Sequence, residues 1–120
     1  MSDAQRNRAV VERFWHSVAA RDIDAYLALF TEQAVAHDPV NKPSLTTPEA
    51  RRASMQAIFD GFARISAETD YVTVCGDHSA SKWTVVGTTA EGQDVVITGI
   101  DVIRHAADGR IEEMWGYFDN

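Results

Sequence analysis

The sequence predicts a single α+β domain, residues 1–120, in which the helices come first and a run of strands follows. Apolar residues recur at helical spacing in the first half of the chain. The second half consists of segments rich in Val, Ile, Thr and aromatic residues, separated by turn sequences such as "AEGQ" and "AADGR". Helices followed by successive strands are typical of the α+β class.

The composition narrows the range of partners. The net charge is -7, and the eleven Lys and Arg residues form no basic cluster, so neither nucleic acid nor an anionic membrane is expected to bind. The single cysteine, Cys75, excludes an intrachain disulfide. No stretch approaches the ~20 apolar residues of a membrane span, and the polar start of the chain lacks an apolar signal core. We therefore expect a cytoplasmic protein.

The first half predicts three helices and one strand. An apolar stripe predicts a helix over Asp3–Ala20; its members are Val10, Val11, Phe14, Trp15 and Val18. Asp22 suits the N-cap of a shorter helix over "IDAYLALF", on which Tyr26 and Phe30 share a face. "EQAVAHDP" predicts a strand that Pro39 ends. Thr47 and Pro48 suit the start of a third helix that continues to about Phe62.

Four strands are expected after the third helix, over residues 67–76, 79–89, 94–105 and 111–119. The strand 94–105 is apolar on both faces: one has Ile97, Gly99, Asp101 and Ile103, and the other has Val96, Thr98, Ile100 and Val102. A sheet with one solvated face alternates apolar and polar residues, so both faces are expected to be covered. The helices cover one face, and the simplest cover for the other is a second subunit, which predicts a homodimer.

Asp101 is the one carboxylate inside this apolar run. Burying an unpaired carboxylate costs several kcal/mol unless it pairs or takes up a proton. Pairing with a buried arginine, or across a dimer interface, would also explain it. Asp38 precedes Pro39, where an aspartate often bonds nearby backbone to start a turn.

The order of these elements resembles ketosteroid isomerase and, more broadly, the polyketide cyclase-like (SnoaL-like) and nuclear transport factor 2-like superfamily. "RDIDAYLALFTEQAVAHDP" is similar to a phrase common in the superfamily, and "GIDVIRHAADGRIEEM" is closer to the isomerase. The resemblance covers nearly the whole chain. It implies a cone-shaped, curved antiparallel sheet wrapped around three N-terminal helices, with an apolar pocket inside.

The resemblance also implies catalytic roles. Asp38 in "AHDPV" matches the family's carboxylate base, and Asp101 in "GIDVIR" matches the protonated aspartic acid that donates to the substrate oxygen. The family's tyrosine donor, 24 residues before the base, falls on Phe14, which has no hydroxyl. Losing one such donor costs about 2.7–4 kcal/mol of transition-state stabilisation. Tyr26 and the indole N–H of Trp83 are candidate substitutes.

The expected activity is a double-bond shift in an apolar, steroid-like carbonyl compound, by proton abstraction next to the carbonyl and without a cofactor. The residues expected to line the pocket are Phe14, Trp15, Tyr26, Phe30, Met55, Phe59, Trp83, Met114, Gly116 and Phe118. In this register Trp115 and Tyr117 point outward. No metal-ligand spacing and no nucleotide-binding fingerprint occurs.

Two alternatives to isomerisation stay open. One is another chemistry of the superfamily: polyketide cyclisation, epoxide opening or dehydration. Epoxide opening in the superfamily uses an Asp–Arg–Asp group, and no arginine here is expected to face the pocket. The other alternative is a non-catalytic ligand-binding or dimerisation module, because one fold hosts many functions.

Overall fold

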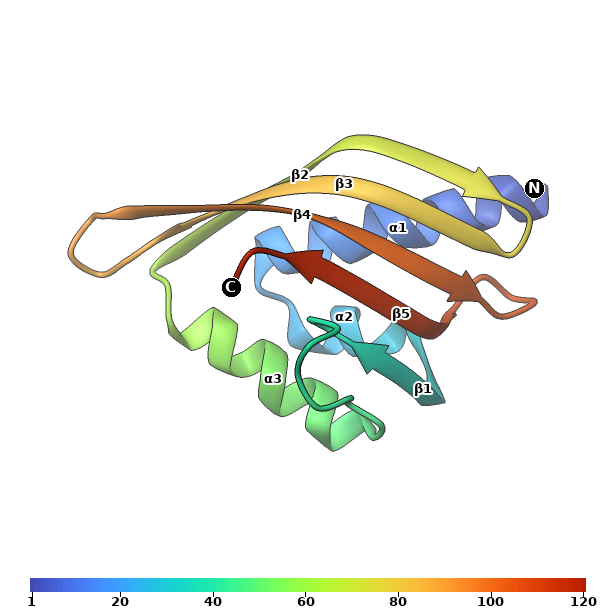
Figure 1. Cartoon of the computed structure of the whole chain (residues 1–120), viewed down its shortest axis with the longest axis horizontal. Helices are drawn as coiled ribbons and strands as arrows, with labels where there is room; N and C mark the ends of the chain where they lie inside the picture. Colours follow the sequence, from blue (N-terminus) through green and yellow to red (C-terminus); the bar gives the residue numbers. More distant parts are fainter.

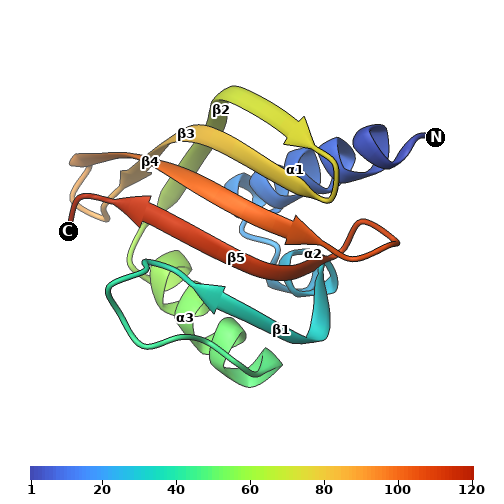
Figure 2. The ribbon, with the colours of Figure 1, turned by 45° about the vertical axis from the view of Figure 1, so that its right-hand side comes forward.

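Three helices lie on one side of a five-stranded sheet that bends around them (Figure 1 and Figure 2). The computed structural model describes residues 1–120. Its elements are α1 (Asp3–Ala20), α2 (Ile23–Ala28), β1 (Phe30–His37), α3 (Pro48–Asp60), β2 (Arg64–Cys75), β3 (His78–Thr88), β4 (Asp94–His105) and β5 (Ile111–Phe118). The predicted α+β class, with a curved sheet around N-terminal helices, is confirmed.

The sheet is mixed, which corrects the expectation of an antiparallel one. Its strand order is β1-β5-β4-β3-β2. The strands β2 to β5 form the predicted antiparallel meander, but β1 pairs with β5 in parallel, with Ala36 opposite Met114. Turn sequences specify only the strands that they join. The direction of β1 depends on pairing with a strand some 80 positions later in the chain, which no local pattern reports.

The helix starts agree with the sequence, but α2 and α3 end earlier than expected, α3 at Asp60 instead of about Phe62. Asp22 accepts a hydrogen bond from the Ala25 N–H at the start of α2, and Thr47 does the same for Ala50 at the start of α3. The helix α2 ends at Ala28, and Phe30 already belongs to β1. The rings of Tyr26 and Phe30 still lie 5.1 Å apart, because the chain turns the two side chains toward the same core.

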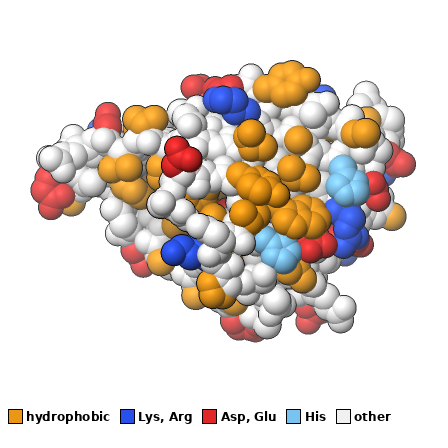
Figure 3. All heavy atoms as spheres, viewed as in Figure 1, with side chains coloured by type: hydrophobic (Ala, Val, Ile, Leu, Met, Phe, Trp, Pro, Cys, Tyr) orange, Lys and Arg blue, Asp and Glu red, His pale blue; other side chains and the backbone are white.

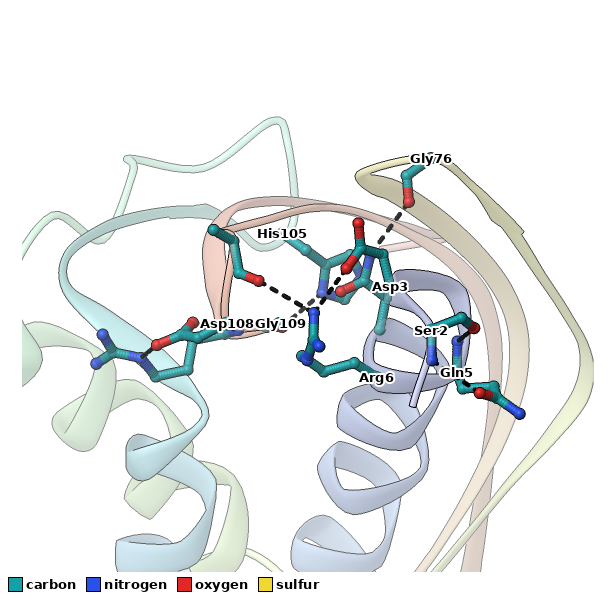
Figure 4. A network of polar contacts seen from close by, with 11 residues as sticks. Ser2, Asp3, Gln5, Arg6, Gly76, His105, Asp108 and Gly109 are labelled. Carbon is teal, nitrogen blue, oxygen red and sulfur yellow. Dashed lines mark hydrogen bonds and ion pairs between the residues drawn. The ribbon is translucent and has the colours of Figure 1, made fainter.

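A polar network fixes the N-terminal end of α1 to two strand turns (Figure 4). Asn7 donates from Nδ2 to the Gly76 carbonyl in the β2–β3 turn. His105, at the end of β4, uses Nδ1 to reach the Gly109 carbonyl and Nε2 to reach the Ser79 hydroxyl. Burial lowers the pKa of His105. Asn7 thus attaches α1 to the β2–β3 turn, and Arg6 attaches it to the β4–β5 turn, because Arg6 Nη1 donates to the Ala107 carbonyl at 3.3 Å.

The two faces of the sheet differ in cover. The inner face packs on the helices and contributes fully buried residues such as Ile103, Ile111 and Met114. The outer face carries exposed apolar side chains, with Ile100 48% and Tyr117 46% exposed. Figure 3 shows apolar side chains gathered over the strands on the side seen in Figure 1. No helix of the chain has the length and apolar content to span a membrane.

Candidate active site

A cavity of about 260 Å³ lies between the helices and the inner face of the sheet. Thirteen of its eighteen lining residues are hydrophobic. The lining consists of Phe14, Trp15, Val18, Tyr26, Asp38, Pro39, Leu45, Ser54, Met55, Ile58, Phe62, Ile65, Trp83, Val85, Gly87, Ile97, Asp101 and Phe118. A concave apolar site with a few convergent polar groups is the usual form of a small-molecule site.

Asp38 follows β1 directly and projects its carboxyl group into this cavity. The carboxyl accepts no hydrogen bond from any group of the chain, so the turn-forming role that is common before proline does not occur here. Burial raises the pKa of Asp38 from 3.8 to about 6. At neutral pH the group is therefore an ionised, poorly solvated base.

Asp101 lies on β4 and is only 3% exposed. Its Oδ1 accepts a hydrogen bond of 3.0 Å from the indole N–H of Trp83, and no arginine pairs with it. Burial, and then the charge of Asp38, raise the pKa of Asp101 well above its ordinary value, while the Trp83 bond opposes them. Two negative charges repel each other strongly in a site with little water, so one of two neighbouring carboxyl groups keeps its proton while the other is ionised.

Gly116 on β5 allows the two carboxyl groups to be neighbours. A Cβ at this position would lie 3.0 Å from Asp38 Cγ and 3.3 Å from Asp101 Oδ1, and closer still to Asp38 Oδ1. Gly99 on β4 has a similar function for Trp83, whose ring occupies the space of the missing side chain. The two glycines thus provide the close approach that brings base, acid and indole together.

Six of the ten residues expected to bind substrate line the cavity: Phe14, Trp15, Tyr26, Met55, Trp83 and Phe118. Phe30, Phe59 and Met114 do not, because they are buried in the core beneath it. Gly116 does not line it either; its contact is with the Asp38 carboxyl. The remaining lining comes from several elements, whose relative placement the sequence alone did not specify. It consists of Val18 on α1, Pro39 and Leu45 after β1, Ser54 and Ile58 on α3, Phe62 after it, Ile65 on β2, Val85 and Gly87 on β3, and Ile97 on β4.

Arg51 on α3 is a buried arginine that sequence reasoning missed. It is 2% exposed and donates from Nη1 to the Ala34 carbonyl at 2.6 Å, with longer bonds to the carbonyls of Thr31 and Glu32. Its guanidinium also stacks over the Phe30 ring, with Cζ 5.2 Å from the centroid. Its burial could have been inferred from its spacing, since residues 51, 55 and 59 share one face of the helix and Met55 and Phe59 are apolar. It lies behind the cavity lining and pairs with neither aspartate.

Comparison with known proteins places these observations in a family. The sequence model of the SnoaL-like domain matches residues 11–114. A steroid Delta-isomerase from Nocardioides simplex is 29% identical over 113 residues, which cover 92% of this chain and 88% of that protein.

Two solved structures have the same fold at low sequence identity. The epoxide hydrolase/cyclase-like enzyme SalBIII, described for pyran ring formation in the polyether salinomycin, superposes with a TM-score of 0.88 at 23% identity, covering 99% of this chain and 95% of its own. An NTF2-like protein from Exiguobacterium has a TM-score of 0.77 at 21% identity, covering 92% of this chain and 98% of its own. The chain belongs to the SnoaL-like domain family and has the NTF2-like fold.

Proposed function

We propose that this protein is a cofactor-independent isomerase that moves a double bond in an apolar carbonyl compound such as a 3-oxo-Δ5-steroid. The observation that carries the proposal is the pair of neighbouring carboxyl groups in one apolar cavity, with Asp38 free of any hydrogen bond and Asp101 held by Trp83. The similarity to a steroid Delta-isomerase supports this substrate class.

The reaction needs one base and one acid. Asp38 takes a proton from the carbon next to the carbonyl, and the C–H electron pair forms a carbon–carbon double bond while the carbonyl π electrons move to oxygen. Asp101 donates a hydrogen bond to that oxygen and keeps its proton. Asp38 then returns its proton to the far end of the dienolate. A base with a pKa of about 6 suits such transfers near neutral pH.

A second candidate is cyclisation of an epoxy alcohol, in which Asp101 would protonate the epoxide oxygen and Asp38 would deprotonate the attacking hydroxyl. Phe14 is compatible with it, because the two aspartates supply the acid and the base and no tyrosine donor is needed at that position. The likeness to SalBIII extends to the fold and leaves the chemistry open.

The test is an assay of one steroid and one epoxy alcohol with wild type, Asp38→Asn and Asp70→Asn. Asp70 is a surface aspartate paired with Lys82 and serves as the matched control. We expect wild type and Asp70→Asn to form the conjugated enone, and Asp38→Asn to lose this activity. Turnover of the epoxy alcohol alone would favour the second candidate. Binding of both compounds without turnover would favour a non-catalytic ligand-binding module.

A further inference from the structure

Tyr26 on α2 is a buried tyrosine whose hydroxyl has no partner in the chain. The residue is 3% exposed and lines the cavity. Its ring lies 5.3 Å from the Phe14 ring and 5.1 Å from the Phe30 ring, measured between centroids. Packing on these rings restricts the phenol, and buried tyrosines usually find a hydrogen-bond partner for the hydroxyl.

The hydroxyl faces the cavity. It forms no hydrogen bond with any protein group. It is also not enclosed, because the one fully buried side-chain polar atom without a partner is Arg51 Nε. A tyrosine that is almost completely buried, lines the cavity and keeps its O–H unpaired presents this donor to whatever occupies the cavity.

Tyr26 shares one cavity with Asp38 and Asp101, and their charges affect its pKa. Burial raises the pKa of Tyr26 well above 10.0, the charges of Asp38 and Asp101 raise it further, and the guanidinium of Arg51 opposes them. The phenol is therefore a neutral donor at any ordinary pH. It lines the same cavity as the two carboxyl groups to which the proposed chemistry is assigned.

We propose that the Tyr26 hydroxyl is the second hydrogen-bond donor to the substrate oxygen, beside Asp101. This inference rests on the proposed function. The phenol comes from α2 and packs against Phe14, so it supplies from a neighbouring helix the donor that position 14 does not have. Tyr26 and Asp101 each keep their proton while the oxygen gains negative charge, and Asp38 alone carries the transferred proton.

The first experiment compares Tyr26→Phe with wild type on the 3-oxo-Δ5-steroid, with Tyr71→Phe as matched control. Tyr71 is 65% exposed on β2. We expect kcat to fall about 10²–10³-fold in Tyr26→Phe, as for loss of one oxyanion donor, and to stay unchanged in Tyr71→Phe. The thermal midpoint of Tyr26→Phe should not fall, because the hydroxyl bonds to nothing in the chain. An unchanged kcat in Tyr26→Phe would overturn the proposal.

A binding measurement separates this proposal from the isomerase reaction itself. The probes are 2-naphthol, whose oxygen mimics the enolate, and naphthalene, which has no oxygen. We expect Tyr26→Phe to weaken binding of 2-naphthol at least about tenfold and to leave naphthalene binding unchanged. That result supports the Tyr26 donor even if wild type does not isomerise the steroid. Equal binding of 2-naphthol by both proteins, or an equal loss for both probes, would overturn it.

Discussion

The substitution Gly116→Ala tests whether the close approach of Asp38 to β5 matters for catalysis. The added Cβ would lie 3.0 Å from Asp38 Cγ, whereas carbon atoms in ordinary contact are about 3.5–4.0 Å apart. Asp38 Oδ1 would lie closer to this Cβ than Cγ does, so the carboxyl group must retreat by at least about 1 Å. The β5 backbone has little freedom to move instead, since it is paired on both sides by β1 and β4.

A displacement of this size has a known catalytic cost. A misplacement of about 1 Å at a reacting group lowers the rate about 10²-fold, which corresponds to about 2.7 kcal/mol in the barrier. We expect kcat for steroid isomerisation to fall by about this factor in Gly116→Ala. The pH at which activity rises should also change, because a displaced Asp38 is buried to a different degree and its pKa changes with its burial.

The matched control is Gly61→Ala at the end of α3. A Cβ there would contact only carbonyl oxygens at 3.5 and 3.6 Å, which are ordinary distances. Gly61→Ala should match wild type in unfolding temperature and in activity. Gly116→Ala should stay folded, with an unfolding temperature lowered by the overpacking, and should lose activity. Retention of wild-type kcat by a folded Gly116→Ala protein would refute the reasoning that the position of Asp38 depends on this glycine.

Four further predictions concern pH, stability, the missing tyrosine and assembly. The rate kcat/KM should fall tenfold per pH unit below about pH 6, where Asp38 becomes protonated; a flat profile would contradict this. Because the folded-state pKa of Asp38 lies above its unfolded value, its contribution to stability declines as pH rises from about 4 to about 6. Asp38→Asn should thus raise the free energy of unfolding at pH 7.5, measured in urea, by up to about 3 kcal/mol. A lower free energy of unfolding in this variant would contradict the raised pKa of Asp38. Phe14→Tyr should raise the isomerisation rate by at most ~10²–10³-fold, most clearly in a Tyr26→Phe background. We propose a homodimer through the outer sheet face, with Trp115 and Tyr117, so sedimentation should show a dimer that Trp115→Lys weakens; monomeric wild type would refute it.

Much of the fold is encoded in local patterns. The N-caps at Asp22 and Thr47 lie where the sequence indicates, since a cap depends on side-chain bonds to backbone groups only three residues away. The strands β2 to β5 follow from turn sequences between β-rich segments. Asp101 could be recognised as unusual from its own strand, because a carboxylate among apolar residues has a cost that demands a reason.

The parts of the site that depend on distant contacts required the tertiary structure. The indole of Trp83 bonds to Asp101 only because β3 and β4 pair in one register and Gly99 leaves room for the ring. The parallel pairing of β1 with β5 brings Asp38 beside Gly116, and no neighbouring residue of either strand indicates that pairing.

The burial of Arg51 and the unpaired hydroxyl of Tyr26 also depend on tertiary contacts that the sequence does not report. Sequence alone established that Tyr26 belongs to a short helix and that Phe14 lacks the family's hydroxyl. Only the packing of α2 against α1 and β1 determined that the Tyr26 ring meets Phe14 and that its O–H reaches the cavity. Side-chain partners across separate elements depend on how helices and strands pack together. That packing minimises the exposed apolar surface of the whole chain, a property that no short segment contains.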